Sequence, residues 1–372
     1  MSTRVLLAGT FDPEFARNRV LASLLEQEGF EVETARRELW GRERHLLVDQ
    51  PKLRLLRRGL TAYPGLVRSV ARAERPDVIL VPYPGYIDMP FVAPIARARR
   101  IPILFDTFIS LYDTIVEDRG LRGRHSAIGR ATHAADTVGC RLADLVLCDT
   151  PAHADYFSEA TGVDRRRFRI LWLGAQEDVF QPQPDVKPEA NLVVFHGTFV
   201  PLQGLPTIIN AAKLLEPDGI RFRIVGDGQE REVVEALVRD LDARNVELPG
   251  RVALEQVPRE IAAGSVCLGI FGTSNKAGRV IPNKLFECLA VGRPVVTADT
   301  AAIREAFTDE VAVVPPGDAP ALAEKIRDLL GQPDHLETLA AKGRARFVEE
   351  FSAQALGRML HGYIDELTRT ES

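Results

Sequence analysis

The feature that most constrains the fold is a repeated alternation of short apolar runs with longer segments of helical periodicity. Residues 4–9 form the first apolar run and end at a glycine, helical periodicity follows over 15–28, and a second run covers 30–34. Further apolar runs lie at 78–81, 101–105 and 145–148. This alternation predicts parallel strands joined by helices, and therefore an α/β fold with a doubly wound sheet covered on both faces.

The alternation stops near the middle of the chain and then resumes. Residues 174–190 contain one glycine, three prolines and several charges, which predicts a linker between domains. In the second series, strands are expected at 192–195, 222–225, near 248, 266–271, 295–298 and 311–314, and helices at 205–215, 232–241, 283–291 and 319–330. The chain of 372 residues exceeds the usual size of a single core, so two Rossmann-like domains are expected, with a ligand in the crevice between their strand ends.

The last stretch, 336–367, has helical periodicity throughout. Breaks are expected near Gly343 and Ser352, because glycine and serine are weak residues in a helix interior.

Composition excludes several classes of protein. The formal net charge of −5 argues against a general nucleic-acid binder, and no apolar stretch is long enough for a signal peptide or a membrane span. We therefore expect a cytoplasmic protein. The four cysteines show no CxxC spacing and are expected to be reduced and structural. No metal-ligand pattern and no GxGxxG fingerprint after a strand occur, which predicts no metal and argues against an NAD enzyme.

The most informative segment runs from 272 to 296. A strand is expected to end at Phe271 and to be followed by a polar, cationic loop that contains Lys276 and Arg279. Pro282 suits the first position of the next helix because its φ is fixed. The free backbone N–H groups that follow, from Asn283 on, form an anion site together with the helix dipole.

Lys284 and Glu287 are three residues apart and share one face of this helix. A cation near the helix start and a carboxylate one turn later suit a nucleoside diphosphate, with phosphate on the lysine and ribose hydroxyls on the glutamate. The alternative is a solvated salt bridge between the two side chains, which is common and weak. The cationic loop beside them favours the nucleotide.

Pro282-Asn283-Lys284-Leu285-Phe286-Glu287 and the Gly292-Arg293-Pro294-Val295-Val296 strand that follows resemble the C-terminal domain of glycosyltransferase family 4. The resemblance covers nearly the whole chain and is strongest from about 190 to 300. It implies the GT-B fold and a Glu287 that holds the donor ribose. The family's first glutamate falls on Arg279 here, and the sequence looks like the subgroup with a Pro-x-Lys-x-x-Phe-Glu motif.

A second segment, Gly197 to Gly204, resembles the family's Gly-Arg-Leu-x-x-x-Lys-Gly loop, whose Arg and Lys neutralise the leaving diphosphate. Thr198 and Gln203 occupy those two positions in this chain. We therefore expect the positive charge to have moved to the opposite side of the diphosphate. There it would be supplied by Lys276, Arg279 and Lys284.

Other segments are matched with less detail. Gly226 and Gly228 end a strand, and the resemblance implies that the donor base lies near Arg251 and Val252. Gly9 and Thr10 follow the first strand, where relatives bring a loop near the donor phosphate. Arg17 and Asn18 open the next helix as either ligand contacts or ordinary first-turn residues.

On the acceptor side, Phe108 falls where relatives often have a histidine near the reacting sugar, so Asp106, Ser110 and Asp113 are the polar candidates there. Tyr83 and Tyr86 either stack on a sugar ring or pack their loop. The arginine-rich stretch 36–75 is either a surface for an anionic membrane with a lipid-linked acceptor or a solvated helical face.

The resemblance implies a nucleotide-sugar-dependent retaining transferase of the hexosyl type. It needs no metal and no cofactor besides its donor, a UDP-sugar rather than a GDP-sugar. The acceptor would be a saccharide or a lipid-linked compound in polysaccharide or glycolipid synthesis. Expected domains are 1–180 for the acceptor and 188–352 for the donor, with 353–372 crossing back onto the first. A degenerate binding or scaffold subunit and a GT-B epimerase remain alternatives.

The predicted catalytic residues are Asp106, Asp113, Arg279 and Lys284. The predicted donor-binding residues are Gly9, Thr10, Gly197, Thr198, Gly226, Gly228, Arg251, Val252, Lys276, Pro282, Asn283, Lys284 and Glu287.

Overall fold

The computed structural model describes residues 3–39, 52–118 and 123–369, with 52–60, 117 and 118 described by their backbone alone. The chain divides into two compact units. Unit 1 comprises Met1–Trp172 and Leu356–Ser372, and unit 2 comprises Leu173–Ala355. The first boundary thus lies before the proline-rich stretch that the sequence analysis assigned to a linker, and unit 1 takes up the chain again at its C-terminal end.

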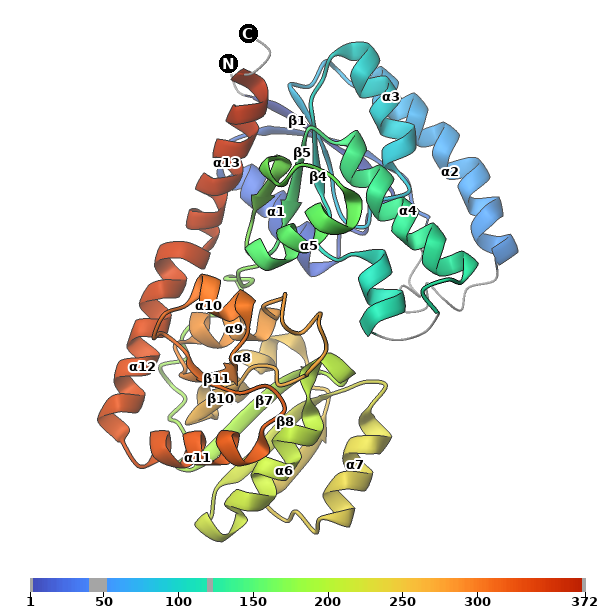
Figure 1. The fold of residues 1–372 in the computed structure, drawn as a ribbon. Helices are drawn as coiled ribbons and strands as arrows, with labels where there is room; N and C mark the ends of the chain where they lie inside the picture. Colours follow the sequence, from blue (N-terminus) through green and yellow to red (C-terminus); the bar gives the residue numbers. More distant parts are fainter. Residues whose placement is uncertain (1–2, 40–51, 119–122, 370–372) are drawn as a thin grey trace. The chain divides into compact units, whose positions relative to one another are not determined.

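Unit 1 is built on a six-stranded parallel sheet (Figure 1). Its strands are β1 (Arg4–Gly9), β2 (Glu31–Arg36), β3 (Val78–Val81), β4 (Ile103–Asp106), β5 (Leu145–Cys148) and β6 (Phe168–Ile170). Its helices are α1 (Ala16–Gln27), α2 (Lys52–Arg72), α3 (Met89–Arg99), α4 (Ala127–Leu142), α5 (Pro151–Thr161) and α13 (Ala353–Arg369), with a π-helical turn at Asp113–Asp118. The strand order is β2-β1-β3-β4-β5-β6, so the order reverses between β1 and β3.

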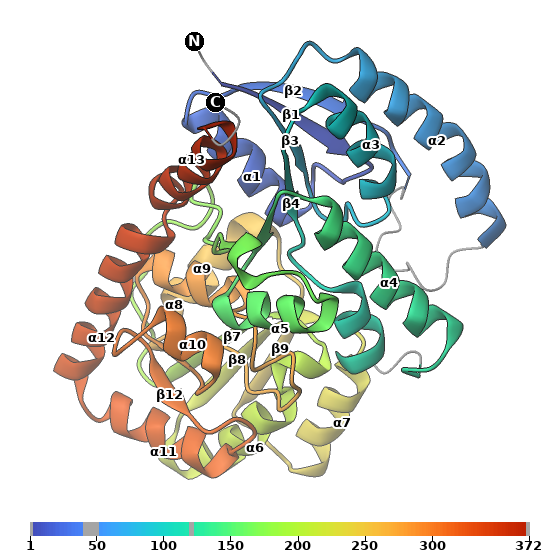
Figure 2. The ribbon, with the colours of Figure 1, turned by 45° about the horizontal axis from the view of Figure 1, so that its top comes forward.

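The central strands of unit 1 are buried along their whole length, as expected for parallel strands with helices on both faces. Helices α2, α3 and α4 lie side by side over one face (Figures 1 and 2). There Leu66, Val92 and Cys140 join Phe105 of β4 in one core. Helix α13 lies against the end of α1, where His361 contacts Glu28 and the ring of Phe30.

Unit 2 repeats the scheme with a second six-stranded parallel sheet. Its strands are β7 (Leu192–Thr198), β8 (Arg221–Asp227), β9 (Val246–Gly250), β10 (Val266–Leu268), β11 (Val295–Ala298) and β12 (Ala312–Val314). Its helices are α6 (Leu205–Leu215), α7 (Arg231–Asp240), α8 (Val257–Ala263), α9 (Asn283–Val291), α10 (Ala301–Ala306), α11 (Ala319–Leu330) and α12 (Pro333–Arg346).

The strand order of unit 2 is β12-β11-β10-β7-β8-β9, which reverses between β10 and β7. The loops after these two strands leave toward opposite faces, and such a reversal opens a crevice at the carboxyl ends of the strands. Two doubly wound sheets confirm the predicted fold class. They also place the β7 and β10 loops, the two segments that the sequence analysis singled out, at this crevice.

Two details of the expected secondary structure are wrong. The strand expected at 266–271 ends at Leu268, and the backbone of Phe271 turns to donate to the carbonyl of Gln203 instead. No break occurs at Gly343, which lies inside α12 because its missing Cβ lets Leu289 and the Glu310 carbonyl pack against the helix. The break near Ser352 is confirmed, since this residue is extended and its hydroxyl caps α13.

Two of the glycines in α12 and α13 give opposite predictions. A Cβ on Gly343 would lie 2.6 Å from Leu289 Cδ2 and 3.0 Å from the Glu310 carbonyl oxygen, so Gly343→Ala should destabilise the protein by about 1–3 kcal/mol. A Cβ on Gly362 of α13 meets nothing within 4 Å, so Gly362→Ala should be neutral or stabilise by up to about 1 kcal/mol. Urea unfolding of both variants tests this, and equal effects would contradict the packing at Gly343.

Candidate functional site

Two loops of unit 2 pack on each other at the switch point. The first follows β7 and leads through a 3-10 turn, Pro201–Gln203, into α6, and the second connects β10 to α9. A Cβ on Gly204 would lie 2.4 Å from the carbonyl carbon of Phe271, and one on Gly272 would lie 2.4 Å from the carbonyl oxygen of Leu202. Both glycines are therefore required for this close approach.

Lys284 on the first turn of α9 is buried, with 4% of its surface exposed. Its ammonium lies 3.4 Å from the centre of the Phe195 ring and donates to the side-chain oxygen of Gln203. A Cβ on Gly197 would lie 2.8 Å from Lys284 Nζ, so a glycine at this position makes room for the ammonium. Among the described residues no carboxylate pairs with Lys284. Burial lowers the pKa of its ammonium well below the usual value, and the nearby Cys288 and Glu287 offset this only in part.

These contacts correct the expected position of the charge. The sequence predicts Lys284 on the side of the diphosphate opposite Gln203, whereas in the structure the Lys284 ammonium donates to Gln203 itself. Gln203 stands at the position of the family's lysine, so α9 supplies a cation to the place from which the β7 loop lost one. The alternative of a solvated salt bridge with Glu287 is wrong, because Lys284 is buried and bonded elsewhere.

Glu287 is one turn further along α9 and is only partly buried. Its Oε2 lies 2.7 Å from Nε2 of His196, a residue of β7 that is 5% exposed. His196 is a site residue that the sequence analysis missed. His196 could have been identified from the sequence, because it directly precedes Gly197 at the end of the predicted strand. Side chains alternate along a strand, so His196 points to the opposite face from Phe195.

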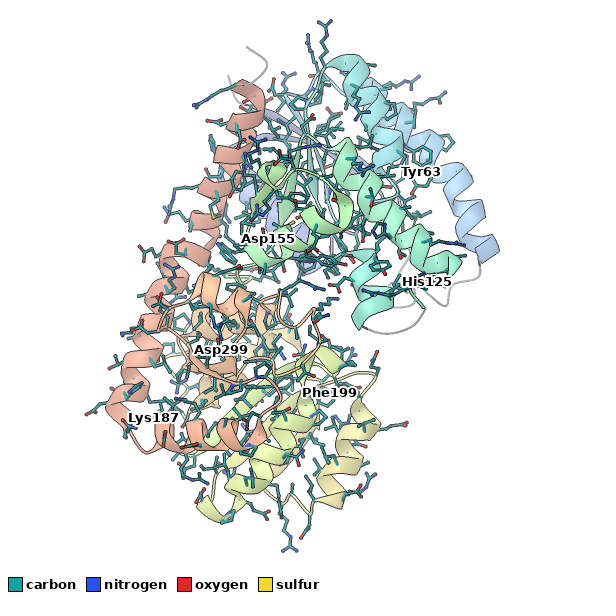
Figure 3. All side chains as sticks on the ribbon, in the orientation of Figure 1. Tyr63, His125, Asp155, Lys187, Phe199 and Asp299 are labelled. Atoms are coloured by element: carbon teal, nitrogen blue, oxygen red, sulfur yellow. The ribbon has the colours of Figure 1, made fainter. Side chains whose placement is uncertain are left out.

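Four further predicted donor-binding residues of unit 2, Gly197, Thr198, Gly226 and Gly228, lie at the ends of β7 and β8. Gly197 and Gly226 are register partners on β7 and β8, and a Cβ on Gly226 would lie 1.9 Å from the Gly197 carbonyl oxygen. Thr198 is exposed as the last residue of β7. A Cβ on Gly228 would meet the backbone of Phe199, which is labelled in Figure 3.

The remaining predicted residues lie around these strand ends. Arg251 and Val252 follow β9, and exposed Arg251 lies 4.0 Å from Asp227 at the end of β8. In the β10–α9 loop Lys276 is buried and Arg279 is half-buried.

Pro282 is extended and precedes α9, which begins at Asn283, so Pro282 is the cap residue rather than the first helical residue. No side chain caps this helix in the described structure. Its first N–H groups therefore lack a side-chain partner, as an anion site at the helix start requires.

In unit 1 the loop predicted to approach the donor phosphate, Gly9 and Thr10, is hydrogen-bonded to the carboxylate of Asp88. Thr10 donates both its N–H, at 2.7 Å, and its hydroxyl, at 3.0 Å, to buried Asp88. A Cβ on Gly9 would lie 2.6 Å from Asp88 Oδ2. Burial raises the pKa of Asp88 to about 6, and the bonds from Thr10 oppose this rise. The donors of Thr10 therefore serve an internal carboxylate at the switch point of unit 1.

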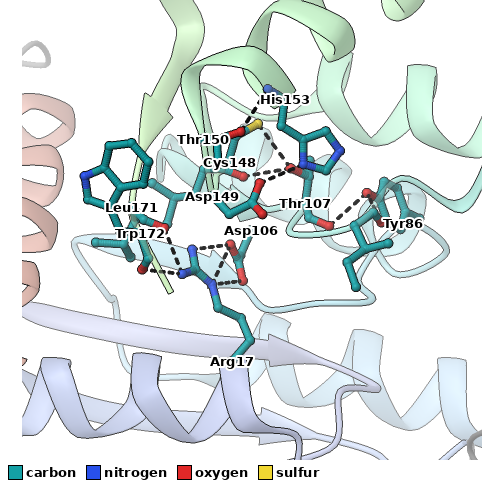
Figure 4. Close-up of polar contacts among 12 residues, drawn as sticks. Arg17, Tyr86, Asp106, Thr107, Cys148, Asp149, Thr150, His153, Leu171 and Trp172 are labelled. Atoms are coloured by element: carbon teal, nitrogen blue, oxygen red, sulfur yellow. Dashed lines mark hydrogen bonds and ion pairs between the residues drawn. The ribbon is translucent and has the colours of Figure 1, made fainter. Parts of the chain in front are cut away.

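Asp106 is held in a buried ion pair within unit 1. Its carboxylate is fully buried at the end of β4 and takes two bonds from Arg17, with Nη2 at 2.9 Å and Nε at 3.1 Å (Figure 4). Arg17 Nη1 also donates to the carbonyls of Leu171 and Trp172, at 2.9 and 3.0 Å. Burial raises the pKa of Asp106, and Arg17 counteracts this. The pair therefore anchors the chain where it leaves unit 1, and the catalytic role of Asp106 stays a prediction.

The other unit 1 candidates are also used within the fold. Asp113 is buried at the start of the π-helical turn, and Ser110 donates to Asp136 at 2.7 Å. Phe108 packs its ring against those of Phe15 and Tyr83, which also contact each other.

Asn18 and Tyr86 hold backbone groups. The Asn18 amide donates to the carbonyls of Asp12 and Tyr83, so its role is structural. Tyr86 is 1% exposed and donates to the carbonyls of Thr107 and Ile109, so it packs the loop and does not stack on a sugar.

The arginine-rich stretch 36–75 is described only in part, since 40–51 and the side chains of 52–60 lie outside the described residues. Arg37 is bonded within the fold to Ser69, whereas Arg68 and Arg72 on α2 are exposed. Within the described ranges no helix is long and apolar enough to cross a membrane. The same ranges hold no cluster of three potential metal ligands, and the four cysteines are buried free thiols.

The Arg17–Asp106 pair gives a prediction on stability. Asp106→Asn would leave the buried guanidinium without its counter-charge, so we expect a loss of about 3–5 kcal/mol in urea unfolding. The matched control is Asp299→Asn, at a residue labelled in Figure 3. It breaks the solvent-accessible pair of Asp299 with Arg304 and should cost less than about 1 kcal/mol. An Asp106→Asn variant as stable as the control would contradict the anchoring role.

Comparisons with known proteins agree with this architecture. Residues 16–174 match the model of a glycosyl transferase 4-like domain, and residues 190–332 match that of glycosyl transferases group 1. The putative colanic acid biosynthesis glycosyl transferase WcaI of Escherichia coli is 28% identical over 166 residues, 43% of this chain and 40% of the relative. The α-D-kanosaminyltransferase of Streptomyces kanamyceticus is 28% identical over 181 residues, 47% of this chain and 46% of the relative. This chain thus matches less than half the length of either relative.

A solved structure, Anabaena HepE in complex with UDP, aligns with 98% of this chain and 100% of its own at a TM-score of 0.68 and 18% identity. This likeness shows the fold. The two family matches together span most of the chain, one on each unit. The chain therefore belongs to the glycosyltransferases of group 1, the family 4 type with the two-domain GT-B fold.

Proposed function

We propose that the protein transfers a sugar from a nucleotide-sugar donor to a hydroxyl group of an acceptor. The observation that carries this proposal is the buried ammonium of Lys284 at the switch-point crevice of unit 2. An ammonium in such a place is costly unless an anion accompanies it. Its direct contacts, Phe195 and Gln203, carry no negative charge, and Glu287 offsets the burial only in part. A diphosphate at the crevice would supply that charge.

The rest of the crevice suits the other parts of a nucleotide. Glu287 is one helical turn from Lys284 and partly exposed, so it can accept hydrogen bonds from ribose hydroxyls. Arg251 and Val252, at the end of the neighbouring edge strand, are where we place the base. We infer a UDP-sugar in preference to a GDP-sugar, and the UDP complex of the HepE structure, which shares the fold, supports this choice.

We infer that transfer retains the anomeric configuration and moves a hexosyl group. The nucleotide would depart while the acceptor hydroxyl attacks the same face of the sugar. The protein's part is to orient the donor and to stabilise the charge that develops on the leaving diphosphate. Lys284 and the free N–H groups at the start of α9 carry that charge in this proposal.

We propose a saccharide or lipid-linked acceptor, in polysaccharide or glycolipid synthesis. The name of WcaI, which refers to colanic acid biosynthesis, supports a polysaccharide. A cavity of about 450 Å³ in unit 1 is lined by two arginines and two histidines, which suits an acceptor with an anionic group; its residues are Tyr112, Arg124, His125, Gly129, Arg130 and His133.

Donor binding tests the role of Lys284 directly. Lys284→Met keeps the length of the side chain and removes its charge, so UDP affinity measured by calorimetry should fall by about tenfold to a hundredfold. Lys342→Met, which alters an exposed lysine of α12 paired with Asp309, should bind UDP as the wild type does. If the wild type bound no nucleotide and hydrolysed no nucleotide sugar, the protein would be a scaffold subunit instead.

Proton linkage gives a second test. An anion beside Lys284 raises its pKa back toward the usual value, so UDP binding should take up protons at a pH between the unbound and the bound pKa. Calorimetry at a series of pH values from about 8 upward, in buffers of different ionisation enthalpy, measures this, because the diphosphate is then fully ionised. We expect proton uptake by the wild type and none by Lys284→Met. Equal uptake by both proteins would place the diphosphate away from Lys284.

A further inference from the structure

The end of β7 holds both functional side chains of α9, one on each face of the sheet. Successive side chains of a strand point to opposite faces, so Phe195 and His196 diverge. Phe195 lies beneath the Lys284 ammonium, which reaches it across Gly197. His196 meets Glu287 on the other face at 2.7 Å.

The hydrogen bond between His196 and Glu287 has a defined direction. An ionised carboxylate only accepts, so His196 Nε2 must carry the proton and donate it to Glu287 Oε2. The other ring nitrogen, Nδ1, is buried and has no partner among the described residues.

The histidine is held more firmly than the glutamate. It lies on an inner strand of the sheet and is paired in register with Val225 of β8. Glu287 is more exposed, and the bond fixes only one of its two oxygens. Oε1 of Glu287 is left to accept from a ligand.

We propose that His196 is a positioning residue for the nucleotide ribose: by donating to Glu287 Oε2 it orients Oε1 toward the ribose hydroxyls. The inference rests on the proposed role of Glu287. It adds that recognition of the ribose requires the histidine as well as the carboxylate. If the histidine served only in packing, replacing it would change the affinity for ribose and deoxyribose ligands equally.

The test compares the binding of UDP with that of 2′-deoxy-UDP and 3′-deoxy-UDP by calorimetry. The wild type should favour UDP over at least one deoxy analogue by about tenfold or more. Glu287→Ala should lose this preference. His196→Leu should lose most of it, and His196→Gln should recover part of it, because its amide N–H can donate from nearly the same place.

The matched control is His361→Gln. It alters another histidine–glutamate pair, His361–Glu28 at 3.1 Å in unit 1, and should keep the full preference. If His196→Leu does not fold, His196→Gln alone still tests the role of His196. The glutamine amide is a weaker donor than the imidazole, so this variant should favour UDP over the deoxy analogues less than the wild type does.

The outcomes separate the two proposals. A preference for UDP that survives Glu287→Ala would overturn the assignment of Glu287 to the ribose. A preference lost in Glu287→Ala but kept in both His196 variants would overturn only the role of His196. Equal weakening of all three ligands in the His196 variants would make the histidine a packing residue and also overturn its positioning role.

Discussion

The structure of unit 2 depends on one constraint, the placing of a buried ammonium at the end of a buried strand. The Lys284 side chain passes over Gly197 and contacts Phe195 and Gln203, and each of these three residues accommodates its ammonium. The glycine leaves space, the ring offers its negative face and the amide offers one oxygen. None of these three groups neutralises the charge, so the crevice suits an anionic ligand.

Unit 1 differs from unit 2, because its buried carboxylates Asp106 and Asp88 are bonded to groups of unit 1 itself. Arg17 neutralises Asp106 and ties the carbonyls of Leu171 and Trp172, where the chain passes into unit 2. Asp88 occupies both donors of Thr10 at the switch point. The two units share a topology, yet only the crevice of unit 2 combines a buried, unneutralised cation with a partly exposed carboxylate among the described residues.

The alternation of apolar runs with helical periodicity predicted the strands of both sheets except β6, because the inner strands of a parallel sheet are buried on both faces and therefore apolar. The three-residue edge strand β6 has no such apolar run and was missed. Local motifs also located α9 and the two residues on it that we propose to bind the donor, Lys284 and Glu287. Contacts across long sequence separations escaped the sequence analysis, because spacing carries no information on them. Nothing local shows that Arg17 neutralises Asp106, that Lys284 reaches Gln203, or that Gly343 makes room for Leu289 rather than ending a helix.

The central claim is that the donor diphosphate binds at the switch point of unit 2 and neutralises Lys284. A crystal structure of the protein with UDP tests this most directly. It should show a phosphate oxygen within about 3 Å of Lys284 Nζ, close to the start of α9. A diphosphate bound elsewhere, with the ammonium still on Gln203 and Phe195 alone, would contradict the claim.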